Sequence, residues 1–306
     1  MISGQKCGTI KEKGAMVPKR PCYYLVVAAV LNTVLDLVFV MKFHMGVEGV
    51  AYATIIAQGI SAILVMVTLL RTSSCVRLDV KKLRIHLPVL RQIVYVGFPA
   101  ALQMAVTAFS NVFVQSYINQ FGADAMGGWT AYAKVDPFVY LPMQSLALAA
   151  TTFVGQNLGR GQMERARKGV RTALILAIVS TIVLSPAIVI AAPQLVIFFN
   201  DKPEVVEYGT LFLRWMIPCF VVICASEIYA GALRGAGNSR TPVLIMLGSY
   251  VLFRQCYLYV MSHCISNSIL PLALGYPIGW LLCSTITTIY YHRVGLGDSL
   301  LERENK

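Results

Sequence analysis

The chain has 306 residues, of which 57% are hydrophobic and 13% are charged. Soluble domains usually carry about 25% charged residues, so this composition excludes an ordinary soluble domain. The net charge of +12 does not indicate nucleic-acid binding, because the basic residues are spread over short segments between long apolar stretches.

Eight apolar stretches follow one another along the chain, and each reaches the ~20 residues that a helix needs to cross a bilayer. The pattern predicts an all-α polytopic membrane protein with eight transmembrane helices. The stretches are Cys22–Met41, Val47–Leu70, Ile93–Phe121, Gly128–Leu158, Thr172–Phe199, Val206–Leu233, Pro242–Cys264 and Pro271–Tyr291.

Positive charge is concentrated in every second gap between these stretches. Most of the 26 lysines and arginines lie in the N-terminal tail, in the gaps after the second, fourth and sixth stretches, and in the C-terminal tail. The alternate gaps hold only Lys42 and Lys202. Because short basic loops stay on the cytoplasmic side of a membrane, we predict a multi-pass protein of the inner (plasma) membrane with both termini in the cytoplasm.

Sequence patterns for metal, nucleotide or redox chemistry are missing. The eight cysteines form no CxxC pair and show no His–Cys spacing typical of metal ligands. The phosphate-binding pattern GxxxxGK followed by Ser or Thr is also missing, which disfavours an ATP-driven pump. The sequence therefore predicts neither an enzyme nor a bound metal or cofactor, and it points to no protein partner.

Two helical hairpins in the chain are similar. The segment KRPCYYLVVAAVLNTVLDLVFVM begins at Lys19 and SRTPVLIMLGSYVLFRQCYLYVM begins at Ser239, and each leads into one further apolar stretch. Both start on the predicted cytoplasmic side, so a repeat would be parallel. Two unrelated hairpins could look this alike, but we favour a repeat of two six-helix lobes. The predicted domains are a cytoplasmic N-terminal tail at 1–20, the last two helices of a truncated N-lobe at 21–70, a basic cytoplasmic linker at 71–92, a six-helix C-lobe at 93–291 and a cytoplasmic C-terminal tail at 292–306.

Polar residues inside the apolar stretches are candidates for function, because an ionisable side chain costs about 2.5–3.5 kcal/mol at the centre of a bilayer. In the first stretch, Asp36 lies one turn after Asn32 on the same helix face. In the third stretch, Gln103, Thr107 and Asn111 recur every four residues and form a polar stripe. This stripe faces either a cavity or a neighbouring helix.

Asp136 in the fourth stretch directly precedes Pro137, where the α conformation is disfavoured, so we expect a kink or local unwinding. Broken helices at membrane depth occur where they line a cavity. Asp136 is therefore a candidate for binding a cation or a proton, with Gln144 on the same face. The alternative is a structural ion pair of Asp136 with Arg254 or Lys134.

Arg254 is the deepest cation of the seventh stretch, with Tyr257 on the same side. We expect it to be either a counter-ion that Asp136 releases when an ion binds, or a permanent structural partner of Asp136. In the sixth stretch, Glu227 and Arg234 lie toward the cytoplasmic end, and we expect both to snorkel to the membrane interface.

Four segments of the chain, in order, resemble one known family. They are residues 19–58 with NTVLDLVFV and GVEGVAYATIIAQ, VGFPAALQ at 96–103, FVGQNLGRGQMERARKG at 153–169 and ALRGAGNSRTP at 232–242. Together they resemble the bacterial branch of the multidrug and toxic compound extrusion (MATE) family over about residues 18–298. The resemblance implies a twelve-helix fold of which this chain lacks the first four helices.

The resemblance also implies a function. Its members are secondary active exporters of cationic, often aromatic compounds, driven by sodium ions or protons through alternating access of two lobes. Asp36 matches the aspartate of the family's NxxLD-like pattern in the fifth helix. Thr107 lies near the position at which some members have a glutamate, and threonine cannot take up or release a proton.

We therefore predict a MATE-like antiporter, here an N-terminally truncated chain, that lies in the lipid bilayer and binds small organic cations or drugs. The candidates for ion coupling are Asp36 and Asp136. A lipid-linked oligosaccharide flippase of the same superfamily is an alternative, although it would need a more cationic cavity than one deep arginine provides. A fragment that does not transport is another. The candidates for the substrate cavity are Asn32, Gln103, Thr107, Asn111, Gln144, Arg254 and Tyr257.

Overall fold

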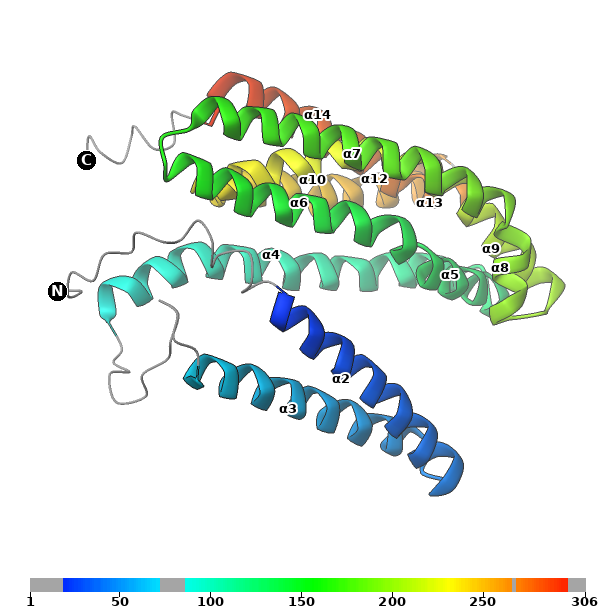
Figure 1. Ribbon diagram of the computed structural model, residues 1–306. Coiled ribbons are helices and arrows are strands. Elements are labelled where there is room, and N and C mark those ends of the chain that lie inside the picture. Colours follow the sequence, from blue (N-terminus) through cyan, green and yellow to red (C-terminus); the bar gives the residue numbers. More distant parts are fainter. Residues whose placement is uncertain (1–18, 72–85, 266–267, 297–306) are drawn as a thin grey trace. The chain divides into compact units, whose positions relative to one another are not determined.

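The computed structural model describes residues 19–71, 86–265 and 268–296, and the regular elements in these ranges are helices (Figure 1). The chain divides into two compact units, Met1–His86 and Leu87–Lys306. This division falls within the predicted linker at 71–92. Most of the predicted N-terminal tail, most of that linker and most of the C-terminal tail lie outside the described residues.

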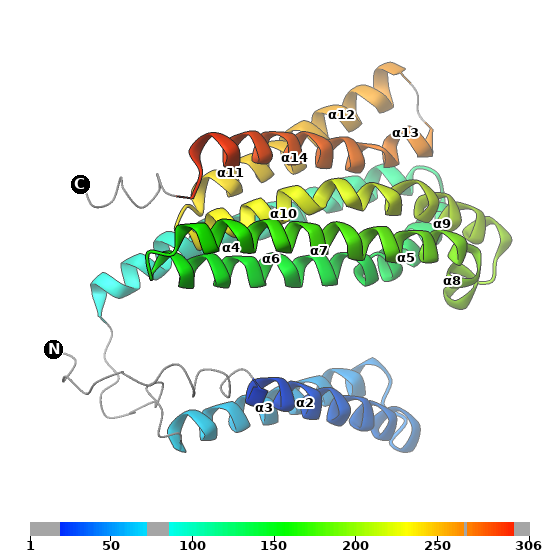
Figure 2. The ribbon, with the colours of Figure 1, turned by 45° about the horizontal axis from the view of Figure 1, so that its top comes forward.

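The first unit is a hairpin of two long helices that lie side by side (Figures 1 and 2). The first, α2 (Lys19–Leu37), continues through the π-helical turn η1 (Val38–Lys42), and α3 (Val47–Arg71) returns along it. Small residues spaced four apart lie on one face of α3, which lets the two backbones approach closely. These buried residues are Gly49, Ala53, Ala57 and Ser61.

The second unit is a bundle whose long helices run side by side, with α8 at one end and the start of α7 at the other (Figures 1 and 2). Its elements are α4 (Leu87–Asn119), α5 (Ala123–Val135), α6 (Pro137–Leu158), α7 (Met163–Ile190), α8 (Ala192–Phe199), α9 (Pro203–Met216), η3 (Ile217–Cys219), α10 (Phe220–Gly235), α11 (Arg240–Leu247), η4 (Gly248–Phe253), α12 (Arg254–Val260), η5 (Met261–Ile265), α13 (Ile269–Ala273) and α14 (Gly275–Val294).

In the described part of the chain, 7 helical segments are long and apolar enough to cross a membrane. The remaining predicted stretch, Ile93–Phe121, corresponds to α4, a helix of 33 residues. The prediction of an all-α polytopic membrane protein is therefore confirmed. The seven segments are Tyr23–Lys42, Val47–Arg71, Ala123–Leu158, Met163–Ile190, Pro203–Gly235, Arg240–Cys264 and Ile269–Val294.

The fifth predicted stretch, Thr172–Phe199, has different bounds in the structure. Its span begins earlier, at Met163, and ends at Ile190, while α8 is a separate short helix. The turn before α7 contains Gly161 with a positive φ of 69°, which glycine adopts without strain. The basic residues predicted to lie in a loop are good helix formers, and they occupy the first turns of α7 instead.

The helix path stays continuous at Asp136. Its backbone is α-helical (φ −55°, ψ −35°), and its N–H donates to the Tyr132 carbonyl oxygen at 3.0 Å. Of the two expectations, local unwinding is therefore wrong, but the span is divided at this residue, since α5 ends at Val135 and α6 begins at Pro137. Pro137 is tolerated because it stands at the start of α6, where its missing N–H costs little.

The centre of the second unit is α10, which packs against α6, α7 and α14. A side chain at Gly231 would bring its Cβ within 2.6 Å of the Ala147 carbonyl oxygen on α6. The Thr151 hydroxyl donates to the Gly231 carbonyl at 2.8 Å across the same contact. Close packing of small residues is typical of helices in membranes, and here it encloses the middle of α10.

Candidate functional site

Asp36 in the first unit has a carboxylate oxygen without a partner. Asn32, one turn before it, donates from Nδ2 to the Thr54 hydroxyl of α3 at 3.3 Å. Asp36 is half-buried, and its Oδ1 is inaccessible and accepts no hydrogen bond from the described residues. An unpaired carboxylate oxygen between apolar helices is unfavourable unless a proton or a cation satisfies it. The arrangement therefore suits ion binding, and Thr54 is a neighbour that the sequence had not indicated.

Arg254 in the second unit is held by neutral groups of neighbouring helices. It is only 4% exposed, and its Nη2 donates to Ser110 Oγ at 2.8 Å and to Asn111 Oδ1 at 2.9 Å, both on α4. Its guanidinium carbon lies 4.5 Å from the ring centroid of Tyr276 on α14, which is a cation–π contact. The π-helical segment η4 directly precedes Arg254, and such segments change which way the following side chains point.

Further hydrogen bonds complete this cluster. Gln255 Nε2 donates to the carbonyl oxygen of Ser110 at 3.0 Å and to its Oγ at 2.8 Å. The Tyr276 hydroxyl donates to Asn111 Oδ1 at 3.4 Å. In the described residues, Arg254 forms no ion pair with Asp136, so the expected permanent pair is wrong, whereas the releasable counter-ion stays a prediction. The oxygens of Ser110 and Asn111 take the place of a carboxylate.

Asp136 is hydrogen-bonded to the side chain of Tyr132, one turn before it. Lys134 is not its partner, because the lysine Nζ lies 5.1 Å from the ring centroid of Phe199. Aromatic rings connect the two sites: the Tyr132 and Trp129 centroids are 5.1 Å apart, and those of Trp129 and Tyr276 are 5.5 Å apart. Asp136 and Arg254 thus lie at opposite ends of one aromatic cluster.

Glu227 on α10 is a buried carboxylate that the sequence analysis had placed at the membrane interface. It is 8% exposed, is hydrogen-bonded to the side chain of Tyr140 on α6 and lies near Arg234. The expected snorkelling of Glu227 is wrong because neighbouring helices cover α10. The sequence contained one sign of this burial. Glu227 lies seven residues before Arg234, or about 10 Å further from the end of the helix.

Among the other predicted cavity residues, Gln103 and Tyr257 make contacts between helices, and the role of this set in a substrate cavity stays a prediction. Gln103 is half-buried and donates from Nε2 to Met246 Sδ at 2.8 Å, and the Tyr257 hydroxyl donates to the Pro271 carbonyl at 3.0 Å. Thr107 is half-buried, whereas Asn111 and Gln144 are exposed. Three cavities of about 710, 690 and 420 Å³ in the described part of the chain are lined by other side chains. The polar stripe was expected to face either a cavity or a neighbouring helix. At Gln103 and Asn111 it contacts a neighbouring helix.

Comparisons with known proteins place the chain in a family. The family model MatE matches residues 99–260, more than half of the chain. The chain is 26% identical over 279 residues to "Probable multidrug resistance protein YpnP" of Bacillus subtilis, covering 89% of this chain and 60% of that protein. It is 25% identical over 284 residues to "Probable multidrug resistance protein NorM" of Thermotoga maritima, covering 91% of this chain and 61% of the relative.

A solved structure described as "Crystal structure of MATE in the bent conformation" superposes with a TM-score of 0.82 at 18% identity, covering 93% of this chain and 63% of that one. This likeness shows the predicted fold over the part that the chain spans. The chain thus spans about 60% of the length of the curated relatives that it matches. From the family match and the fold together, the chain belongs to the MATE family, whose members are membrane transporters and not enzymes.

Proposed function

We propose that the chain acts as a MATE-type secondary active antiporter, which exports drugs or organic cations in exchange for sodium ions or protons by alternating access. Membership of the family supports this proposal, and so do the relatives named multidrug resistance proteins. Because the chain spans about 60% of those relatives, export by this chain itself is part of the proposal.

The observation that carries ion coupling is the unpartnered oxygen of Asp36. A coupling site must be able to bind and release a cation during each cycle, so it cannot be saturated by its own protein. Asn32 and Thr54 are already hydrogen-bonded to each other between α2 and α3. Carboxylate, amide and hydroxyl oxygens, the kinds that these three residues carry, are hard ligands that suit sodium, and the carboxylate alone suffices for a proton.

Asp136 and Glu227 are the proposed coupling groups of the second unit. Each is bonded to a tyrosine, Tyr132 and Tyr140 respectively. Tyr140 also interacts electrostatically with both carboxylates. A tyrosine hydroxyl can donate to an ionised carboxylate or accept from a protonated one, so these pairs tolerate either state. Asp136 and Glu227 are therefore the proposed ion-binding or proton-binding acids of the second unit, as Asp36 is of the first.

Flipping of a lipid-linked oligosaccharide is the less favoured alternative. A diphosphate needs several free guanidinium donors, whereas the deep arginine directs its Nη2 at Ser110 and Asn111, and its Nε is the buried nitrogen left without a partner among the described residues. Arg214, a further arginine within a described span, is exposed on α9. The structure of the Arg254 cluster therefore favours a cationic substrate.

We also propose that the start of α7 and the end of α14 face the cytoplasm, with both termini on that side of the inner membrane. The basic residues in the first turns of α7 support this orientation, since cytoplasmic segments near membrane spans are enriched in Lys and Arg. Labelling of single cysteines introduced at Arg160 and at Asp201 tests it. A membrane-impermeant reagent applied to whole cells should label position 201 and not position 160, and the reverse would overturn the orientation.

A transport assay tests the proposed function. The 306-residue chain would be reconstituted into vesicles, and movement of the cationic dye ethidium would be followed after imposing a sodium or a proton gradient. We expect dye movement that requires one of the two gradients. Movement that is equal with and without gradients would overturn coupling. No movement above protein-free vesicles would support the alternative of a non-transporting fragment.

A further inference from the structure

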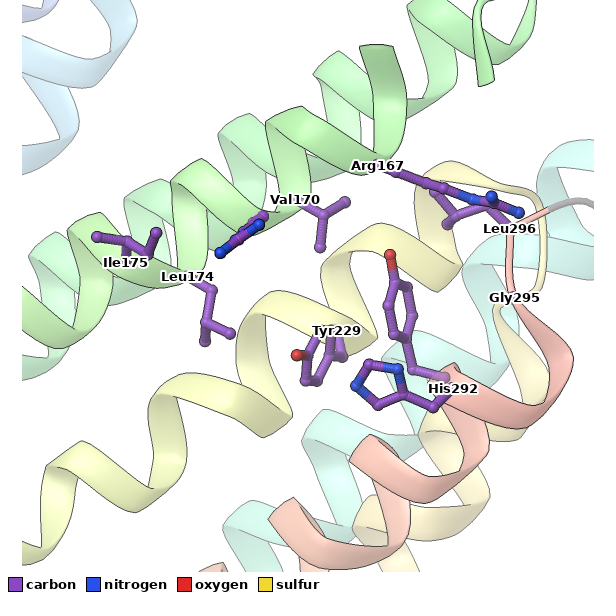
Figure 3. A pocket seen from close by; sticks show the side chains of 10 residues that line it. Arg167, Val170, Leu174, Ile175, Tyr229, His292, Gly295 and Leu296 are labelled. Carbon is purple, nitrogen blue, oxygen red and sulfur yellow. The ribbon is translucent and has the colours of Figure 1, made fainter. Parts of the chain in front are cut away.

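A cavity of about 710 Å³ lies at the basic end of the second unit and belongs to neither carboxylate site (Figure 3). Three elements form it: the first turns of α7, the middle of α10 and the end of α14. In Figure 3, Arg167 and Leu174 of α7 lie across the cavity from Tyr229 of α10 and His292 of α14. Both basic and aromatic side chains line it.

Two arginines give the cavity its charge. Arg167 and Arg171 both line it and lie four residues apart, on the same face of α7. Among the described residues, neither forms an ion pair, although Glu164 lies one turn before Arg167. His292 adds a third nitrogen-bearing side chain from α14. The cavity therefore presents cationic hydrogen-bond donors that have no anionic partner in the described part of the chain.

Tyrosines form the wall opposite the arginines. The rings of Tyr229 and Tyr291 are stacked, with centroids 4.4 Å apart and planes 20° from parallel, and His292 packs edge-on against both. Tyr291 interacts electrostatically with Arg167. Stacking fixes the two phenol groups in place, and each hydroxyl can donate a hydrogen bond to an anion between the helices.

The cavity changes from charged to apolar along α7. Val170, Leu174 and Ile175 line it beyond the arginines, and Ile175 is 51% exposed. Leu174 lies about 10 Å deeper along the helix than Arg167. A ligand that fills the whole cavity therefore has an anionic group at the membrane surface and a hydrocarbon group below it.

We propose that this cavity binds an anionic phospholipid, with its phosphate between Arg167, Arg171 and the tyrosine hydroxyls and an acyl chain along Leu174 and Ile175. Arginine guanidinium groups bind phosphate oxygens by paired hydrogen bonds, and basic pockets between membrane helices bind acidic head groups. The bilayer holds such lipids at the mouth of the cavity, which favours a lipid over free phosphate. In the proposed orientation, this lipid belongs to the cytoplasmic leaflet. Lipid binding itself does not depend on transport.

Lipid titration of the purified chain in detergent tests the proposal. Native mass spectrometry would measure the affinities for phosphatidylglycerol and phosphatidylcholine of the wild type and of the double variant Arg167→Ala, Arg171→Ala. The matched control is Arg165→Ala, Lys168→Ala, which removes the same charge from the same turns, where the side chains line a different cavity.

We expect the wild type and the control to prefer phosphatidylglycerol. The Arg167/Arg171 variant should bind it about thirtyfold more weakly and bind phosphatidylcholine unchanged. An equal loss in the control, or no preference for phosphatidylglycerol in the wild type, would overturn the site. Displacement of the lipid by millimolar inorganic phosphate would overturn the lipid assignment in favour of a free anion, whereas persistence of the lipid would support it.

Discussion

Two groups of arginines in the second unit differ in their surroundings. Arg254 is 4% exposed, and its guanidinium is held by Ser110, Asn111 and the ring of Tyr276. Arg167 and Arg171 line a cavity and form no ion pair with any described residue. The difference teaches that a deep charge is not by itself a binding site. A cation whose partners belong to the chain stabilises the fold, and one without such partners is available to a ligand.

The carboxylates show the same contrast. Asp136 and Glu227 are hydrogen-bonded to tyrosines of the second unit, whereas Asp36 in the first unit has an oxygen without a partner among the described residues. Polar groups that lack a partner within the protein are therefore the better candidates for reversible binding of ions or lipids.

The largest effect is expected for Arg254→Ala. The substitution leaves a cavity and removes the donor that Ser110 and Asn111 share, so the free energy of unfolding should fall by about 3 kcal/mol. Denaturant titration in detergent micelles would measure it. The control is Arg214→Ala, at an exposed arginine within a span, which should change stability by less than about 0.5 kcal/mol. Equal effects of the two variants would mean that the Arg254 cluster does not stabilise the fold.

A smaller loss is expected for Ser110→Ala. Ser110 is 1% exposed, and its Oγ accepts from both Arg254 and Gln255. Removing the hydroxyl leaves the buried Arg254 and the half-buried Gln255 with fewer acceptors, which should cost about 1–2 kcal/mol in the same titration. Ser116→Ala is the comparison on the same helix, because that hydroxyl is exposed and bonds only the Val112 carbonyl. A stable Ser110→Ala protein would show that Arg254 finds other acceptors.

The smallest effect is expected for the double variant Arg167→Ala, Arg171→Ala in lipid-free detergent. Both side chains are exposed and unpaired among the described residues, so stability should change by less than about 0.5 kcal/mol. A loss close to that of Arg254→Ala would contradict the contrast between the two arginine groups and would assign these side chains to the fold.

The sequence predicted the membrane spans well because hydropathy and charge depend only on composition within short windows. It also identified Arg254 as deep, whereas the role of Asp36 in ion coupling stays a prediction. The partners of Arg254 could not be predicted, since Ser110 lies 144 residues away in the chain and nothing local indicates that α4 and α12 meet there. Glu227 was misplaced because its burial depends on the helices around α10.

The start of α7 illustrates a second limit. Charge density marked residues 160–171 as a loop, but Arg, Lys and Ala all favour helices, and the turn at Gly161 is sufficient to connect α6 with α7. The cavity between α7, α10 and α14 exists only because these basic residues are helical and keep a regular spacing. A linear pattern of charge predicts the side of the membrane on which a segment lies, but it does not predict the shape of the surface that these side chains form.

The claim that Asp36 couples export to an ion gradient is tested most directly by measuring gradient-driven dye movement in the Asp36→Asn variant. Asparagine keeps the size of the side chain but cannot bind a proton and is a weaker ligand for sodium. In vesicles that contain the 306-residue chain, gradient-driven ethidium movement should fall to the level of protein-free vesicles for Asp36→Asn and stay unchanged for Asp201→Asn, at an exposed acid outside the spans. Undiminished gradient-driven movement by Asp36→Asn would contradict coupling through the unpartnered carboxylate.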